Sequence, residues 1–147
     1  MRAQCASAPA SGDRKRSVAG SAARIATRSD DGVAAASGTR IVGSVDYFRR
    51  RPDDTGAMVH ETAHVVQAYR SRRNPSWLVE GVADYIRFVK YEPENIGRFD
   101  PSRARYNQSY RTSARFLAYL ADTYDAEIVR KLNRVMREGK YREAVFE

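Results

Sequence analysis

Both histidines of the chain lie in the segment His60–His64, which reads H-E-x-x-H. In a helix, residues four positions apart lie one above the other on the same face. Two imidazoles at this spacing can bind one Zn²⁺ through one nitrogen each. Glu61 follows the first histidine, so its carboxylate can face a metal-bound water without being a ligand. The pattern therefore predicts a catalytic zinc site with Glu61 as its general base.

The surrounding residues favour a helix for this segment. Residues 53–55 follow Pro52 and offer side-chain oxygens for an N-cap, and Asn74-Pro75 ends the apolar pattern. His60 and His64 are polar exceptions in an otherwise apolar stretch. Because unpaired buried imidazoles are costly, a bound metal explains them. The alternative is a helix whose two histidines only pack or cap.

A catalytic zinc site needs a third protein ligand. The chain has no third histidine, and its single cysteine is Cys5, far away in the N-terminal tail. A carboxylate is therefore expected. Glu80 and Asp84 are the only acids of an apolar helix predicted over residues 77–90, and their spacing places them on one face.

A helix hairpin would bring this acidic pair to the histidines. We expect Glu80 to be the third ligand and Asp84 to accept a hydrogen bond from a ligand histidine, the usual role of a residue behind the ligands. The alternative is that either acid forms a buried ion pair with an arginine, Arg70 or Arg87.

Three segments in combination resemble the plant basic secretory protein family, also described as the peptidase family of plants and bacteria. They are His60–Gln67, Trp77–Arg87 and Ser113–Leu117. The H-E-x-x-H motif followed by E-x-x-x-D on a downstream helix is similar to the gluzincin arrangement. The resemblance runs from about Asp31 to the C-terminus.

The resemblance implies a secreted, zinc-dependent hydrolase with a zincin fold, acting on a peptide or protein substrate. By position it implies His60, His64 and Glu80 as metal ligands. It also implies Glu61 as the general base. The oxyanion formed in such a reaction needs a donor besides the metal. Tyr110 occupies the place of a family tyrosine and is our candidate; the alternative is a core or helix-start aromatic residue.

Two arginines follow Tyr110 closely. Arg111 stands where the family tends to have an acid, so the local electrostatics differ. Arg115 is a candidate for orienting a substrate carboxylate or Asp84. We favour the other interpretation of Arg115, as a structural or surface arginine.

The net charge of +8, from 26 basic and 18 acidic residues, is spread along the chain. Nucleic-acid readers usually cluster such charge with aromatic residues or on one helix. The distribution therefore favours a generally cationic surface over nucleic-acid binding.

No run of about 18 apolar residues exists, so no membrane span is expected. The start of the chain lacks an apolar signal segment, so the protein is cytoplasmic or its true start lies upstream of Met1.

We predict one α+β, mostly helical, zincin-like domain over residues 30–147, with a small N-terminal strand region packed on the active-site helix and a C-terminal helical part. Residues 1–29 are rich in Ala, Ser, Gly and Arg and are predicted to be a disordered basic tail. Alternating residues predict a strand over residues 39–48, which is either a sheet edge that pairs with substrate or an ordinary structural strand.

A long loop over residues 91–109 is typical of functional loops. Helices are predicted over residues 110–124 and from Asp125 to Gly139. Residues 141–146 begin a further element, so the domain looks truncated at both ends. We expect a monomeric zinc peptidase. The alternatives are an inactive, cationic zinc-binding homologue and a cell-wall or nucleic-acid binding protein.

Overall fold

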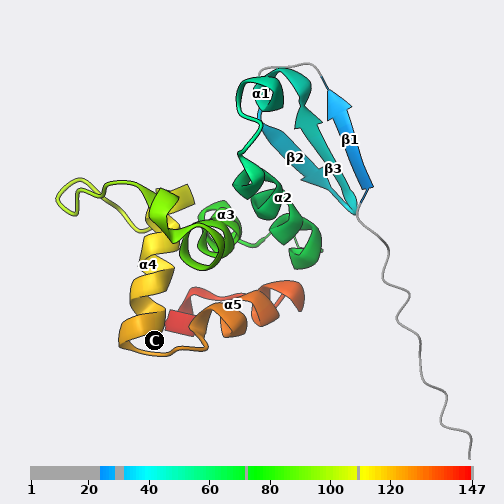
Figure 1. The fold of residues 1–147 in the computed structure, drawn as a ribbon. Helices are drawn as coiled ribbons and strands as arrows, with labels where there is room; N and C mark the ends of the chain where they lie inside the picture. Colours follow the sequence, from blue (N-terminus) through cyan, green and yellow to red (C-terminus); the bar gives the residue numbers. More distant parts are fainter. Residues whose placement is uncertain (1–23, 29–31, 72, 109, 147) are drawn as a thin grey trace, which may run out of the picture.

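The computed structural model describes residues 24–28, 32–71, 73–108 and 110–146. It has the predicted mostly helical α+β fold, with a three-stranded mixed sheet followed by helices (Figure 1). In chain order the elements are β1 (Arg24–Arg28), β2 (Ala34–Ser37), β3 (Arg40–Ser44), α1 (Val45–Arg50), α2 (Thr55–Gln67), α3 (Ser76–Tyr85), the π-helix η1 (Ile86–Tyr91), the 3₁₀-helix η2 (Pro93–Ile96), α4 (Tyr110–Thr123), α5 (Ile128–Arg137) and the 3₁₀-helix η3 (Glu143–Phe146). None of these helices is long and apolar enough to cross a membrane.

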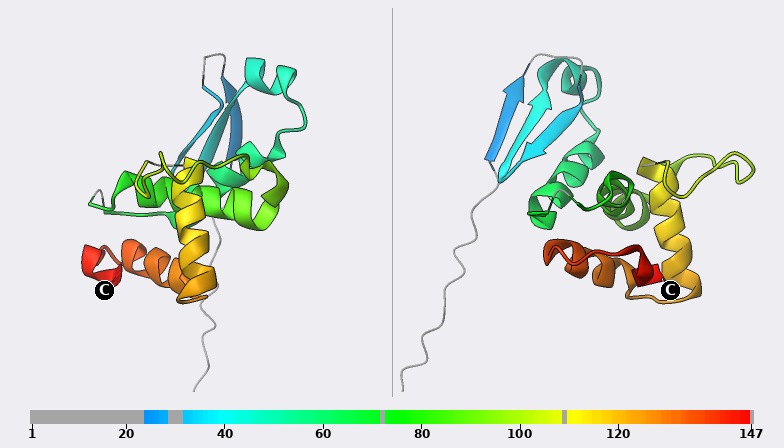
Figure 2. Two further views of the ribbon diagram at one scale, coloured as in Figure 1. Left: turned by 90° about the vertical axis from the view of Figure 1, so that its left-hand side faces the viewer. Right: turned by 180° about the vertical axis from the view of Figure 1, so that it is seen from behind.

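The sheet has the strand order β1-β3-β2 and lies over α2 (Figures 1 and 2). β1 runs parallel to β3, whereas β2 pairs with β3 as an antiparallel hairpin. Gly38 has a φ of +58° in the hairpin turn, a conformation that glycine adopts without strain. Both β2 and β3 contact α2, so the edge strand β2 lies beside the helix that carries both histidines.

The strand predicted over residues 39–48 is wrong in its second half. β3 ends at Ser44, and the next six residues form α1. The Ser44 hydroxyl accepts a hydrogen bond from the Tyr47 backbone N–H at 3.3 Å, a cap that favours a helix start over an extended chain. β3 is also the middle strand of the described sheet, which excludes the substrate-pairing edge and leaves the other alternative, an ordinary structural strand.

The described part of the predicted N-terminal tail, residues 24–28, is a strand. Arg24–Arg28 form β1, because the backbone of β3 offers them a parallel partner that the composition of the segment does not reveal. The remaining residues of that tail, 1–23 and 29, lie outside the described residues. The division of the chain into a tail and a domain stays a prediction.

α2 ends earlier than the sequence predicts. Its C-cap, Ala68, has a left-handed backbone with φ +43°, so the chain leaves the helix six residues before Asn74. Pro75 is instead the N-cap of α3. The Gln67 side chain donates a hydrogen bond to the carbonyl of Val79 at 2.9 Å and ties the end of α2 to the start of α3.

The core lies between α3, α4 and α5. Its buried residues are Leu78, Val82, Tyr85, Ala114, Leu117, Val129, Leu132 and Met136. α3 and α4 approach closely at Gly81, where an added Cβ would lie 2.7 Å from the Cβ of Ser113. This contact holds the first turn of α4 against α3 at the residue next to Glu80.

Candidate metal centre

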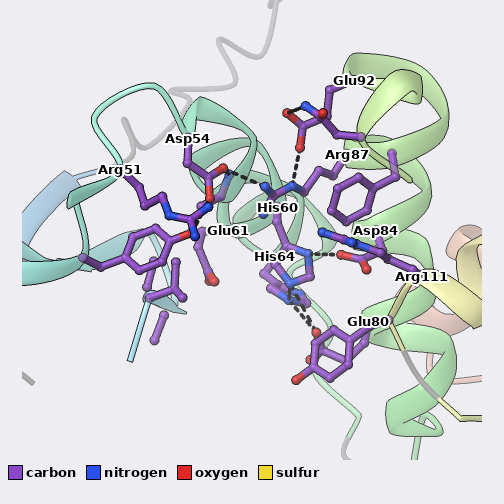
Figure 3. Close-up of a pocket in the computed structure, with 18 of the residues that line it drawn as sticks. Arg51, Asp54, His60, Glu61, His64, Glu80, Asp84, Arg87, Glu92 and Arg111 are labelled. Atoms are coloured by element: carbon purple, nitrogen blue, oxygen red, sulfur yellow. Dashed lines mark hydrogen bonds and ion pairs between the residues drawn. The ribbon is translucent and has the colours of Figure 1, made fainter. Parts of the chain in front are cut away.

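Three side chains from two helices converge at one point, as the sequence predicts. His60 and His64 project from α2, and Glu80 from α3 (Figure 3). The two Nε2 atoms are 3.0 Å apart, and an oxygen of Glu80 lies 3.2 and 3.3 Å from them. Ligand atoms of a tetrahedral zinc site lie about 3.3 Å from one another when each is about 2.0–2.1 Å from the metal. The spacing of the three atoms therefore fits one zinc ion.

The far side of the His60 ring contacts Asp84. Nδ1 of His60 lies 2.7 Å from the Asp84 carboxylate, whose residue is only 3% exposed. Because an ionised carboxylate can only accept, the N–H of the neutral ring is on Nδ1 and the lone pair is on Nε2. Asp84 is therefore placed where the sequence predicts it, behind a candidate ligand.

The His64 ring is oriented by Gln67, which is 4% exposed. The Gln67 amide nitrogen donates to the Val79 carbonyl, so its oxygen must face Nδ1 of His64, at 2.8 Å. The neutral His64 ring then also presents its lone pair on Nε2. Sequence reasoning gave Gln67 no function; the available signal was its position three residues after His64, on the same helix face.

The site consequently brings together three lone-pair donors, an arrangement that needs a cation between them. In the metal-free protein, protons meet this need. Burial opposes the charged form of His60, but Asp84 and Glu80 outweigh it and raise the pKa of His60 to about 9. Burial likewise opposes ionisation of Glu80, yet its bonds to both histidines lower its pKa to about 2. The pKa of His64 is also raised, against burial, by Glu80 and Gln67.

Glu61 and Tyr110, the two candidate catalytic residues, both line the cavity at this centre. Glu61 is 9% exposed, and Figure 3 shows its side chain directed into the cavity away from the three converging groups. It has no hydrogen bond or ion pair among the described residues. The Tyr110 ring stacks near His60 with centroids 6.4 Å apart, and Tyr110 is 55% exposed.

A partly buried charge network forms one end of the cavity. Arg87 donates to Asp54 at 2.6 Å and to Glu92 at 2.5 Å. Tyr47 also donates to Asp54, and this bond contributes to the lowered pKa of Asp54 although burial acts to raise it. Glu92 approaches the first turn of α2 because Gly56 has no Cβ; one placed there would lie 2.1 Å from its oxygen. The sequence analysis missed this network.

These contacts decide two alternatives of the sequence analysis. Arg87 pairs with Asp54 and Glu92, and Arg70 forms no ion pair with the described residues, so neither arginine is the partner of Glu80 or Asp84. Arg115 donates to the backbone carbonyls of Ile96 and Gly97 and stabilises the loop before α4. Its contacts favour the interpretation as a structural arginine.

An H-E-x-x-H helix with a glutamate from the next helix is typical of metal-dependent hydrolases. A family model described as "Peptidase of plants and bacteria" matches residues 7–147, and the chain belongs to this family. This match begins at residue 7, whereas the resemblance described in the sequence analysis begins at about Asp31. Neither a curated protein nor a solved structure was found to match the chain.

Proposed function

We propose that the protein is a zinc-dependent metallopeptidase that hydrolyses peptide bonds with an activated water. The carrying observation is the convergence of His60, His64 and Glu80, with Nδ1 of each ring hydrogen-bonded to Asp84 or Gln67 and both Nε2 atoms directed at one point. Zinc prefers nitrogen ligands of this kind together with one carboxylate. When bound, the ion lowers the pKa of a water towards neutrality and polarises the substrate carbonyl.

Glu61 is the proposed general base. Its carboxylate accepts the proton of the attacking water and passes it to the leaving amine. The absence of a competing ion pair for Glu61 in the described part of the chain leaves the carboxylate available for this step. Tyr110 is the proposed oxyanion donor: its ring lies beside His60, and its exposed hydroxyl can approach a substrate carbonyl.

β2 is the strand that we propose to bind the substrate backbone. It is an edge of the described sheet, and Ala34, Ala35 and Ala36 line the same cavity as the metal centre. An extended peptide can hydrogen-bond to such an edge as an added strand. The small alanine side chains leave room for it. We therefore propose for β2 the substrate-pairing role that was one of the two alternatives for residues 39–48.

Zinc analysis combined with a peptide-cleavage screen tests the proposal. We expect about one zinc per folded chain and cleavage that a chelator abolishes. Glu61→Gln should retain zinc and lose nearly all cleavage, because an amide cannot accept the proton of the water. Glu80→Gln should instead weaken zinc binding. Full zinc occupancy without cleavage would support the inactive homologue, and a His64→Ala variant with full zinc would refute the metal site.

A further inference from the structure

Arg111, in the first turn of α4, extends into the cavity of the metal centre. Figure 3 shows Arg111 on the α4 side of this cavity, which His60 and Asp84 also line. The guanidinium carbon lies 4.3 Å from the ring centre of Phe88, and Phe88 is 3% exposed. A planar guanidinium stacked on a buried aromatic ring is held in position with its edge free to donate hydrogen bonds.

The charge of Arg111 has no partner in the described part of the chain. It forms no ion pair or hydrogen bond there, although Asp84 lines the same cavity. Arg87 contacts the same Phe88 ring at 4.6 Å but is neutralised by two carboxylates, Asp54 and Glu92. Of these two guanidinium groups on Phe88, Arg111 is therefore the one available to a ligand.

We propose that Arg111 determines substrate specificity by binding a carboxylate of the peptide close to the bond that is cleaved. The inference rests on the proposed peptidase function and adds a substrate class to it. A guanidinium matches a carboxylate through two parallel N–H···O bonds. The neighbouring carboxylates of Glu61, Glu80 and Asp84 repel an anion, so the free edge of Arg111 fixes where a substrate carboxylate binds.

The carboxylate has two possible sources, an Asp or Glu side chain or the free C-terminus of the peptide. Matched peptides separate them. One set replaces Gln by Glu at successive positions around the cleaved bond, which is located by mass spectrometry. A second set carries the same sequence with a free or an amidated C-terminus. The ratio of kcat/KM within each pair measures the preference for the carboxylate.

We expect the wild-type protein to prefer the carboxylate peptide in one set by roughly ten- to a hundredfold, the range of a charged hydrogen bond. Arg111→Gln should reduce this ratio to about one and change cleavage of the neutral peptide by less than about threefold. Arg111→Lys should retain part of the preference, since it keeps the charge without the paired geometry.

Arg51→Gln is the matched control, because it removes the same charge from the same cavity at the end near Asp54 (Figure 3). Arg51→Gln should keep the wild-type ratio. An equal reduction of the kcat/KM ratio in both variants would show that the preference arises from the overall positive charge of the cavity. That result would overturn the inference. A wild-type ratio near one in both peptide sets, or an unchanged ratio in Arg111→Gln, would also overturn it.

A binding measurement separates failure of this inference from failure of the proposed function. Fluorescence anisotropy of the same labelled peptides, with zinc present and with Glu61→Gln in every protein to prevent cleavage, reports the carboxylate preference without turnover. Weaker binding of the carboxylate peptide when Arg111→Gln is added, with unchanged binding of the neutral one, supports the inference even if no peptide is cleaved by the wild-type protein. Equal affinities for the two peptides in the Glu61→Gln protein that retains Arg111 would refute it.

Discussion

Gln67 connects the ring of His64 to the backbone of Val79, the residue immediately before Glu80. Its oxygen lies 2.8 Å from Nδ1 of His64, and its nitrogen donates to the Val79 carbonyl at 2.9 Å. The orientation of a candidate ligand on α2 is thus coupled to the position of a candidate ligand on α3. One buried amide sets both the histidine tautomer and the distance between the two helices at the site.

Gln67→Leu is therefore expected to weaken zinc binding by roughly ten- to a hundredfold, the typical effect of losing a residue that orients a ligand. It should also lower the free energy of unfolding by about 1–3 kcal/mol, because the buried Gln67 amide makes hydrogen bonds to both the His64 ring and the Val79 carbonyl that leucine cannot replace. Competition with a chromophoric chelator measures the affinity. Retained affinity in Gln67→Leu would show that packing alone orients His64.

Asp84→Asn tests the corresponding contact of His60. The amide can still accept a hydrogen bond, but it has no charge, so the neutral carboxamide stabilises the metal-bound imidazole less. We expect weaker zinc binding and, in the zinc-free protein, a pKa of His60 below the value of about 9 that Asp84 and Glu80 produce. NMR titration of the two histidines measures this shift. An unchanged His60 pKa would contradict the assignment.

Zinc binding near neutral pH should release protons. At pH 7 the zinc-free protein carries a protonated His60, since its pKa is raised to about 9, and the metal needs the neutral ring. The apparent zinc affinity should therefore rise with pH up to about 9. Calorimetry in buffers of different ionisation enthalpy measures the protons released. No release at pH 7 would mean that the histidines are already neutral.

The stability of the zinc-free protein should change with pH in two windows. The raised pKa of His60 contributes stability that is present below about pH 6.5 and is lost as the pH rises through about 9. The lowered pKa of Glu80 contributes stability that is present above about pH 4.5 and is lost as the pH falls through about 2. Thermal unfolding with a chelator present should show a loss of stability in both pH windows. Saturating zinc should remove the loss of stability at alkaline pH.

The centre could be anticipated from the sequence because its geometry is mostly local. Helix spacing alone places His60 and His64 on one face, and the same spacing relates Glu80 to Asp84. A short connection between two helices then makes their contact the expected arrangement. The family match agrees with this interpretation without assigning a role to any residue.

The remaining features depend on contacts between distant segments. Nothing near Arg24–Arg28 indicates a strand, because the partner that creates it is β3. Gln67 is an ordinary helix residue until Val79 is placed beside it. The network of Arg87 joins residues 33 and 5 positions away in the chain. Side chains of this kind acquire a function only from the tertiary structure.

The close approach of α3 and α4 at Gly81 leads to a last prediction. Gly81→Ala would place a Cβ 2.7 Å from the Cβ of Ser113, and two packed helices must separate to accommodate it. Overpacking of this kind costs about 1–3 kcal/mol, partly offset by the better helix propensity of alanine. Because Glu80 precedes Gly81, zinc binding should weaken together with stability.

Ser113→Gly supplies the matched test, since it removes the Cβ that Gly81→Ala would contact. The single Ser113 variant loses the hydrogen bond of its hydroxyl to the Tyr106 carbonyl at 2.8 Å and should be destabilised on its own. The double variant should nevertheless be more stable than the sum of the two single effects predicts. Denaturant unfolding of the four proteins gives this coupling energy. Strict additivity would show that α3 and α4 adjust freely at this contact, and that the spacing of Glu80 from the histidines is set elsewhere.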